Sequence, residues 1–374
     1  MTTHLLVPHG FEANYVVGFA RGLAANGIRL LVVSDGDTAP MLEAAGIPHR
    51  NLRGSVDPKR SSWSKALNLV RYYLRLAAII VRHRHATVHF CGLLGSRIIL
   101  FDGIFLPLWL RFWSTRYVHT AHNALPHGRE QQRIFYWAYR WIYRFPHTIL
   151  AHTDKVAGQL TTDFGVDPAR IEVISIGLNE EVPATTLSTS AARLQLGLPA
   201  TGPIALFFGK VEPYKGVDVL VEAWNTVRTP QAHLAIAGTC PDADYAASVR
   251  ATVARSARPA TVEWRSGFVA NDQVAIWLKA CDLVVMPYRH IYQSGVVFLC
   301  LRFGVPIVAT NVGSLADYVE SSGVIAITND PNGLAEALDR GFSLLETFDR
   351  NEIARRAEKY RWEHQCAAIK HLYE

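Results

Sequence analysis

Two lysines lie in one short segment that joins an apolar run to a predicted helix. The segment reads FFGKVEPYKG, residues 207–216, and contains Lys210 and Lys215. A lysine ammonium is a suitable counter-charge for a diphosphate, and the N-terminus of a helix beginning at Val217 favours anions as well. The pattern predicts a phosphate-binding loop made of Gly209, Lys210 and Lys215, although an isolated pair of loop lysines is more often simply solvated.

A second segment also joins the end of an apolar run to a predicted helix. Residues 287–297, PYRHIYQSGVV, begin where an apolar run ends, and Ser294-Gly295 opens a helix-like run that continues to Phe303. Free amides at such a helix start can bind an anion, but Ser-Gly is also a common sequence at the start of helices in general. The candidate ligand-binding residues of this segment are Tyr288, Gln293, Ser294, Gly295, Val296 and Val297.

With five further segments, these motifs make the chain resemble glycosyltransferase family 4, the retaining family with the GT-B fold. The resemblance covers nearly the whole chain, because the matching segments follow one another in the family's order. They are VHTAHNALPH, IEVISIGLN, FFGKVEPYKGVDVLVEAW, VEWRSGFVANDQVAIWLKACDLVVMP, FGVPIVATNVGSLADYV and KYRWEHQCAAIKHLYE.

The resemblance implies transfer of a hexose from a nucleotide sugar to a hydroxyl, with retention at the anomeric carbon and without a metal. By this likeness Lys210 and Lys215 neutralise the departing diphosphate, while the amides of residues 294–297 hold the β-phosphate or sugar hydroxyls. His122, in a Thr-x-His setting, would be the catalytic-site histidine that contacts the donor sugar or the acceptor. His9 and Gly10 would form the acceptor-side loop.

One departure from the family pattern concerns two glutamates. The family usually carries them eight positions apart before the Gly-x-Pro turn, and counting back from Gly304 those places hold Ile291 and Leu299. The sequence Gln293-Ser294-Gly295-Val296 is interpreted as the substitute found in a branch of the family.

Two other clusters are compatible with metal binding. Asp35-Gly36-Asp37 has the spacing of a divalent-cation site, but it follows a predicted strand, where a surface turn is the preferred interpretation. His83, His85 and His89 lie in a basic stretch whose charge opposes a cation, so we interpret them as a solvated helix end. No metal site is predicted.

The apolar runs alternate with helix-length stretches, as parallel doubly wound sheets require. We predict an α/β protein of two Rossmann-like domains that face each other across a ligand cleft. The predicted ranges are an N-terminal domain at 1–182, a Pro/Thr/Ser/Ala-rich linker at 183–201, a C-terminal domain at 202–357 and a final helix at 358–374 that completes the first domain.

The net charge of +6 is unevenly distributed, since residues 1–150 carry +11 and residues 151–374 carry −5. Such asymmetry suggests an anionic partner: a membrane surface, a nucleic acid or a phosphorylated substrate. The helix positions Arg71, Arg75 and Arg82 fall within about 40° of one another on a helical wheel. A second basic row contains Arg133, Arg140 and Arg144, interleaved with aromatic residues that suit an interfacial helix.

Burial of those aromatics in the core is our first interpretation, and docking of the basic rows on an anionic membrane is the second. No nucleic-acid-binding motif is present, so we predict no nucleic-acid partner. The five scattered cysteines and the lack of a signal-peptide pattern favour a reducing cytosol, and no uninterrupted apolar run is long enough to cross a membrane.

These observations predict a glycosyltransferase on the cytoplasmic face of the cell membrane. Its donor would be a UDP- or GDP-linked sugar, with no other cofactor. Its acceptor would be a saccharide linked to polyprenyl diphosphate, in surface polysaccharide synthesis. The alternatives are a non-catalytic GT-B binding subunit, which the missing glutamates favour, and a nucleotide-sugar epimerase, which needs carboxylates that the motifs do not supply.

Overall fold

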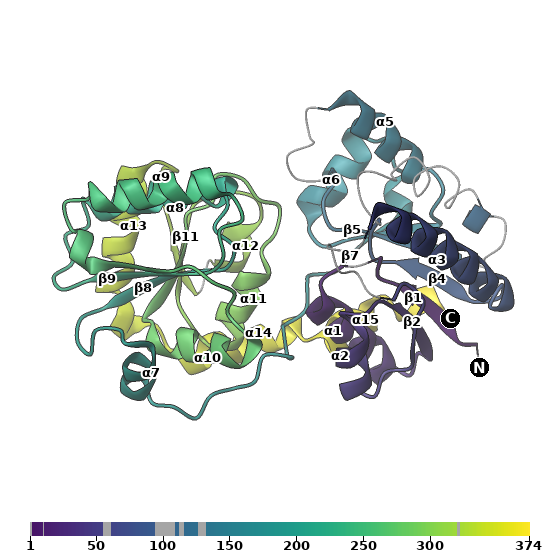
Figure 1. The fold of residues 1–374 in the computed structure, drawn as a ribbon, viewed down its shortest axis with the longest axis horizontal. Coiled ribbons are helices and arrows are strands. Elements are labelled where there is room, and N and C mark those ends of the chain that lie inside the picture. Colours follow the sequence, from purple (N-terminus) through teal and green to yellow (C-terminus); the bar gives the residue numbers. More distant parts are fainter. Residues whose placement is uncertain are drawn as a thin grey trace. The chain divides into compact units, whose positions relative to one another are not determined.

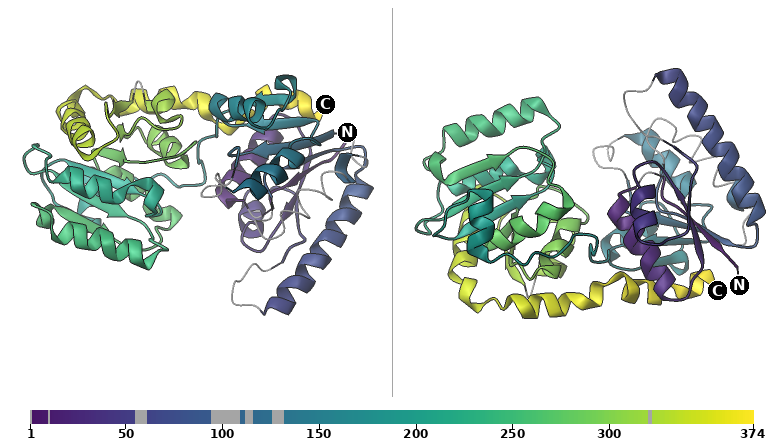
Figure 2. Two further views of the ribbon diagram at one scale, coloured as in Figure 1. Left: turned by 90° about the horizontal axis from the view of Figure 1, so that it is seen from above. Right: turned by 60° about the horizontal axis from the view of Figure 1, so that its bottom comes forward.

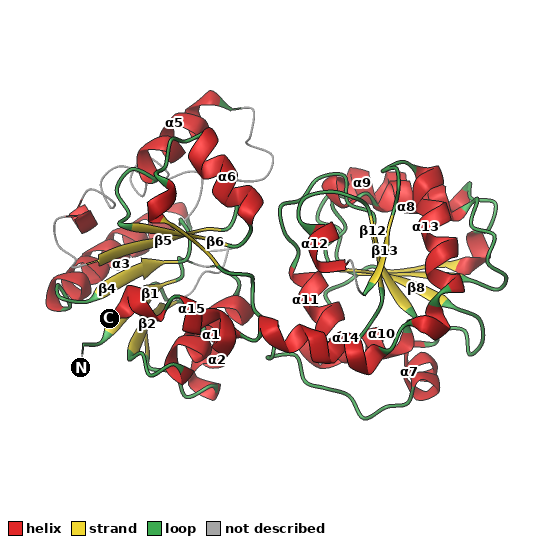
Figure 3. Cartoon of the chain, turned by 180° about the vertical axis from the view of Figure 1, so that it is seen from behind, coloured by secondary structure: helices red, strands yellow, loops and turns green. Residues whose placement is uncertain are grey.

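The computed structural model describes residues 2–9, 11–54, 61–93, 109–111, 116–125, 132–319 and 322–374. The chain divides into two compact units (Figure 1): unit 1 comprises Met1–Gly177 and Tyr360–Glu374, and unit 2 comprises Leu178–Lys359. Each unit is a parallel sheet covered by helices (Figure 3). The two Rossmann-like α/β domains predicted from the sequence are therefore confirmed.

Unit 1 contains seven strands in the order β3-β2-β1-β4-β5-β6-β7. The order runs outward from β1 in one direction and then from β4 in the other, so β1 and β4 flank a topological switch point, where such sheets bind ligands. The strands are β1 (His4–Val7), β2 (Leu30–Ser34), β3 (His49–Asn51), β4 (Thr87–Phe90), β5 (Arg116–Ala121), β6 (Thr148–Ala151) and β7 (Ile171–Val173).

Right-handed crossovers place the helices on the two faces of this sheet. The helices that follow β1 and β2 lie on one face, and those that precede β4, β6 and β7 lie on the other. The first group is α1 (Ala13–Ala25) and α2 (Ala39–Ala44), and the second is α3 (Ser62–Arg82), α5 (Arg133–Ile142) and α6 (Asp154–Thr162). The long helix α3 stands at the outside of the unit (Figure 2).

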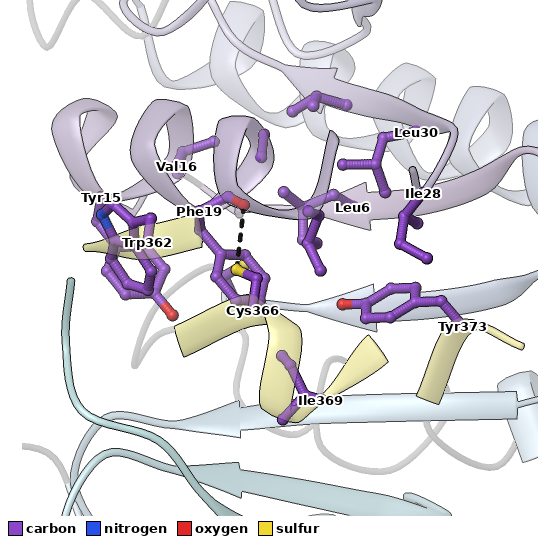
Figure 4. Close-up of a cluster of buried hydrophobic side chains, with 14 of the residues drawn as sticks. Leu6, Tyr15, Val16, Phe19, Ile28, Leu30, Trp362, Cys366, Ile369 and Tyr373 are labelled. Atoms are coloured by element: carbon purple, nitrogen blue, oxygen red, sulfur yellow. Dashed lines mark hydrogen bonds between the residues drawn. The ribbon is translucent and has the colours of Figure 1, made fainter. Parts of the chain in front are cut away.

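The C-terminal segment returns to unit 1 and packs on α1 through α15 (Trp362–Ala368). Trp362 is buried against three glycines: a Cβ atom at Gly18 would lie 2.3 Å from its Nε1, one at Gly177 2.2 Å from its Cδ2, and one at Gly22 2.5 Å from its carbonyl oxygen. Cys366 Sγ lies 3.7 Å from the carbonyl oxygen of Phe19 (Figure 4). The segment therefore completes the core on the α1 face.

Unit 2 has six strands in the order β10-β9-β8-β11-β12-β13. Its strands are β8 (Ile204–Phe208), β9 (His233–Ala237), β10 (Val262–Arg265), β11 (Leu283–Met286), β12 (Ile307–Ala309) and β13 (Gly323–Ile325). Its helices are α7 (Thr189–Leu196), α8 (Val217–Trp224), α9 (Ala243–Ala254), α10 (Asn271–Ala280), α11 (Gly295–Arg302), α12 (Leu315–Val319), α13 (Pro331–Ser343) and α14 (Arg350–Ala357).

Some local features differ from the expectations. The range expected as a linker, 183–201, contains α7, which packs on α10 in unit 2. The division into units lies at Gly177 and Leu178. The final residues form α15 between two single turns of 3₁₀ helix. The interpretation of His89 as part of a solvated helix end is wrong, because the residue is fully buried on β4.

We expect Gly18→Ala to lower stability by about 1–3 kcal/mol, because the new methyl group would overlap the buried indole of Trp362. Gly158→Ala is the matched control: a Cβ atom at this α6 glycine would meet nothing within 4 Å. It should raise stability by about 0.5–1 kcal/mol through helix propensity. Urea denaturation followed by circular dichroism measures both effects. Equal effects of the two substitutions would contradict the packing described for Trp362.

Candidate functional site

The loop after β8 brings two of the predicted phosphate-binding residues together. Gly209 has φ +111°, and a Cβ atom there would lie 3.4 Å from Lys215 Nζ and 3.8 Å from Val296 Cγ2. Gly238 packs closely on Gly209: a Cβ atom placed at Gly238 would lie 1.9 Å from the Gly209 carbonyl oxygen. Because Gly209 has no side chain, a space remains there, and it is bordered by the ammonium of Lys215 and the first turn of α11.

The ammonium of Lys215 also lies beside two aromatic rings. Its Nζ is 5.9 Å from the ring centre of Tyr214 and 5.8 Å from that of Tyr288. The Tyr288 hydroxyl is 3.3 Å from Ser294 Oγ, and burial raises the pKa of Tyr288 to about 12, so this phenol is neutral. The two predicted segments of unit 2 thus meet around Lys215.

The start of α11 offers hydrogen-bond donors. Ser294 occupies its N-cap without a side-chain cap bond, and within the described residues the amides of Gly295 and Val296 donate to no acceptor. Gln293 precedes this turn, and its buried Nε2 likewise has no hydrogen-bond partner among the described residues. Unpartnered buried donors are uncommon in proteins. Three donors beside an ammonium are suited to an anionic ligand.

An ion pair that was not predicted joins the two loops. Arg289 donates from Nη1 and Nη2 to the Asp218 carboxylate at 2.7 and 2.6 Å, and the Tyr245 hydroxyl donates to the same group at 2.7 Å. The Arg289 amide also donates to the Tyr214 carbonyl at 2.8 Å. Burial raises the pKa of Asp218, but the hydrogen bonds from Arg289 and Tyr245 outweigh it and lower the pKa overall.

The two positions where the family usually has glutamates are apolar and buried here. Ile291 is 5% exposed and Leu299 is 8% exposed. The loop that holds Ile291 is fixed by Gly313, where a Cβ atom would lie 2.0 Å from the Ile291 carbonyl oxygen. Neither side chain can hydrogen-bond a ligand, so the polar contacts on this side of the site fall to Gln293 and the amides of α11.

Unit 1 has a cavity of about 220 Å³ at its switch point, beside the carboxyl ends of β1, β4 and β5. Among the described residues its lining contains histidine, tyrosine, asparagine and threonine but no aspartate or glutamate. The lining residues are Pro8, His9, Phe11, Gly92, Leu93, His119, Thr120, Ala121, His122, Asn123, Tyr139 and Tyr143. This composition provides neutral hydrogen-bonding groups.

The geometry of His122 fixes which ring nitrogen can bind a ligand. The imidazole stacks on Phe11 with ring centres 3.7 Å apart, and Nε2 lies 2.7 Å from the Cys91 carbonyl oxygen. A carbonyl can only accept, so Nε2 carries the proton. Burial and the neighbouring His152 lower the pKa of His122 well below its usual value, which leaves Nδ1 as a neutral acceptor suited to a hydroxyl.

The cavity also contains His119, which the sequence reasoning missed. It is 2% exposed, and within the described residues its Nδ1 has no hydrogen-bond partner. Burial and the nearby His9 lower its pKa to about 3. His9 adopts φ +55°, uncommon for a residue other than glycine, with Nδ1 3.2 Å from the Gly92 carbonyl oxygen. The sequence feature that could have identified His119 is the pair of histidines, His119 and His122, three positions apart at the end of a strand.

The other candidate residues lie as follows. Lys210 is exposed and has no contact with Lys215 or α11 among the described residues. The Val297 amide donates to the Ser294 carbonyl at 3.1 Å, so it is occupied. Gly10 lies outside the described residues. Asp35 accepts from the amides of Asp37 and Thr38, which is a local turn.

Two family models match the chain in tandem. The model described as "Glycosyl transferase 4-like domain" matches residues 12–177, and the one described as "Glycosyl transferases group 1" matches residues 202–343. The chain belongs to the GT4-like glycosyltransferases of the GT-B fold. The two matched segments fall within unit 1 and unit 2 respectively.

Relatives and solved structures agree with this family. The D-inositol 3-phosphate glycosyltransferase of Jonesia denitrificans is 27% identical over 70% of this chain and 66% of its own length. That of Streptosporangium roseum is 31% identical over 51% and 46%. The chain thus spans between about half and two thirds of these curated relatives.

Two solved structures share the fold of this GT4-like chain at low identity. Anabaena HepE in complex with UDP and glucose is 18% identical, with TM-score 0.76 and 99% of both chains covered. The sucrose-phosphate synthase from Thermosynechococcus elongatus is 18% identical, with TM-score 0.74 over 99% of this chain and 97% of that one.

We expect Asp218→Asn to lower stability at neutral pH by roughly 1 kcal/mol, as for exposed ion pairs of good geometry. The folded-state pKa of Asp218 is lowered. Its contribution is therefore present above the usual aspartate pKa of about 3.9 and is lost as the pH falls through the folded pKa. Thermal melts of wild type and variant should converge below about pH 4.

Glu263→Gln is the control, because it removes a similarly exposed pair with Arg265 that joins no two loops. The variant Glu263→Gln should leave nucleotide binding unchanged. Identical pH profiles for wild type and Asp218→Asn would contradict the role of this pair.

Proposed function

We propose that the protein transfers a hexose from a nucleotide-diphosphate sugar to a saccharide hydroxyl, with retention and without a metal. The observation that carries this proposal is the convergence of the Lys215 ammonium and the first turn of α11 on the space at Gly209, with the buried Gln293 Nε2, which has no partner among the described residues, two positions before that helix. In this proposal the QSGV sequence takes the place of the family's paired glutamates.

The chemistry follows from charge. When the glycosidic bond to the diphosphate breaks, negative charge develops on the leaving oxygen. A fixed ammonium and backbone donors stabilise that charge more in the transition state than in the ground state. Lys215, held beside Tyr288 and close to Gly209, is the residue that supplies this stabilisation. Lys210 adds a more distant, solvated charge.

A uridine diphosphate donor is the first choice between UDP- and GDP-linked sugars. HepE, which shares the fold, is described in complex with UDP and glucose. No further cofactor is part of the proposal.

The cavity of unit 1 is proposed to hold the acceptor. Its neutral histidines can accept hydrogen bonds from sugar hydroxyls, with His122 Nδ1 oriented by the Cys91 carbonyl. We propose a saccharide linked to polyprenyl diphosphate in surface polysaccharide synthesis. A fold neighbour of 12% identity and TM-score 0.69 is a lipopolysaccharide outer core galactosyltransferase, WaaB.

The proposed location is the cytoplasmic face of the cell membrane, with the anionic bilayer surface as a partner. The +11 charge of residues 1–150 supports it. Among the described residues no helix is long and apolar enough to cross a bilayer.

A non-catalytic binding subunit is the second candidate, and the buried apolar Ile291 and Leu299 favour it. A nucleotide-sugar epimerase is the third. It requires acid and base groups, and the cavity lining of unit 1 has no carboxylate.

The donor site is tested by a thermal-shift panel of UDP, GDP, ADP, TDP and CDP. A diphosphate at about 100 times its dissociation constant should stabilise the wild type by roughly 2.7 kcal/mol, a shift of a few degrees. Lys215→Ala should abolish the shift and Gln293→Leu should reduce it, because each removes a donor to the anion. Lys279→Ala, on α10, is the charge-matched control. If no diphosphate shifts the wild type, the binding-subunit alternative replaces the transferase.

The acceptor is tested by incubating radiolabelled nucleotide sugar with the protein and lipid-linked saccharides extracted from membranes. Label should move into the organic phase and be released by mild acid. His122→Phe keeps a ring stacked on Phe11 but loses Nδ1, so transfer should fall about 10²-fold while the diphosphate shift persists. Label in a free epimerised nucleotide sugar would support the epimerase, and label on a soluble acceptor alone would disprove the lipid-linked substrate.

A further inference from the structure

Helix α3 carries large apolar side chains on the side that faces away from its core. Their exposed fractions are 85% for Trp63, 49% for Leu67, 56% for Val70, 67% for Leu74 and 42% for Val81. At 100° per residue these positions fall within about 60° of one another and form one stripe about 27 Å long. The opposite side of α3 is buried through Tyr72, Leu76, Ile79 and Ile80.

Helix α5 has the same arrangement. Ile134, Trp137 and Trp141 are 62%, 65% and 40% exposed, while Phe135, Ala138 and Ile142 are buried. Core packing, the first interpretation of this helix, holds for the face with Phe135, and the two tryptophans lie on the remaining face. Because α3 and α5 cover the same face of the sheet, both stripes belong to one side of unit 1.

Arginines flank both stripes. Arg71, Arg75 and Arg82 lie about 90° around α3 from its stripe, and Arg133, Arg140 and Arg144 lie about 70° around α5. All six are exposed, and among the described residues no ion pair or hydrogen bond of their guanidinium groups is found. The sequence has no acidic residue from 61 to 101 or from 131 to 153, so acidic residues are scarce around both helices, although Glu130 lies three positions before Arg133.

This pattern decides between possible partners. Nucleic acid is bound through basic side chains at the centre of a surface, with aromatics that stack on bases. Here the apolar side chains, tryptophans among them, form a continuous stripe on each helix, and the guanidinium groups lie along one side of that stripe. An interfacial helix on an anionic bilayer has this order, with its apolar stripe at the acyl boundary and its cations at the phosphates.

We propose that the stripes of α3 and α5 insert into the interface of an anionic bilayer, with the flanking arginines on lipid phosphates. This inference specifies the membrane partner in the proposed function and names the surface that binds it. An arginine close to an anionic bilayer contributes about fivefold to the partition constant. The two stripes make binding depend on apolar contact as well as on charge.

The test is sedimentation with vesicles of phosphatidylcholine, alone or mixed with phosphatidylglycerol. Wild type should bind the mixed vesicles much more strongly. Val70→Ser with Leu74→Ser should reduce binding to mixed vesicles at least tenfold. Leu194→Ser, at a leucine of unit 2 that is 83% exposed, should not reduce binding. Arg71→Gln with Arg75→Gln should remove most of the preference for anionic vesicles, whereas Arg255→Gln, an exposed arginine of unit 2, should not.

A spectroscopic readout separates insertion from surface adsorption. Brominated lipids should quench tryptophan emission on binding, and Trp63→Phe should remove part of that quenching. The inference is overturned if the α3 double variant binds as the wild type does. It is equally overturned if that variant changes only the solution mass, since the stripe would then be a contact between two copies of the chain.

Vesicle binding needs no donor or acceptor, so it separates this inference from the proposed activity. Lys215→Ala should lose the diphosphate shift and keep vesicle binding. The double variant of α3 should show the reverse.

Discussion

Unit 1 depends on the burial of one indole. The chain leaves this unit at Gly177 and re-enters it at Tyr360, and Trp362 lies against Gly177 as well as against Gly18 and Gly22 of α1. A side chain at Gly18 or Gly177 would displace the indole, and one at Gly22 would displace the Trp362 carbonyl and Cys366, so this close approach of the C-terminal segment requires glycine at all three positions. The core on the α1 face is thus assembled from the two ends of the chain.

The same C-terminal segment reaches the cavity through hydrogen bonds. The Tyr373 hydroxyl lies 2.5 Å from His89 Nδ1, and His89 Nε2 lies 2.7 Å from Oγ1 of Thr120, which lines the cavity. Burial lowers the pKa of His89 to about 3 and that of His152 to about 4. The buried histidines His89, His119, His122 and His152 are therefore neutral at physiological pH, and His119 and His122 present lone pairs and donors to the cavity in place of positive charge. A polyhydroxyl ligand suits such a surface better than a phosphate does, whereas Lys215 makes the site of unit 2 suited to phosphate.

The sequence predicted the parallel sheets well because their central strands are short continuous apolar runs between helices. It missed β3, whose residues His49, Arg50 and Asn51 carry no apolar pattern because an edge strand has one unpaired side. In unit 2 the phosphate loop was predictable from Gly209 and Lys215, which are close in sequence. The Asp218–Arg289 pair was not predictable, because its partners are 71 residues apart and only the fold brings them together. His119 was missed although His122 follows it by three positions, because only the fold shows that both residues line one cavity.

Helix α3 shows a limit of periodicity itself. It has two apolar faces, and a hydrophobic pattern with two maxima cannot say which one packs on the sheet. A sheet face can bury only one side of a helix, and the side with Tyr72, Leu76, Ile79 and Ile80 is the buried one. The other stripe gains much less from folding of the described chain, since its side chains remain 42–85% exposed in the native state. Five large apolar residues aligned on that side are therefore accounted for by a contact outside the chain, and the arginines beside them limit that contact to a surface that is both apolar and anionic.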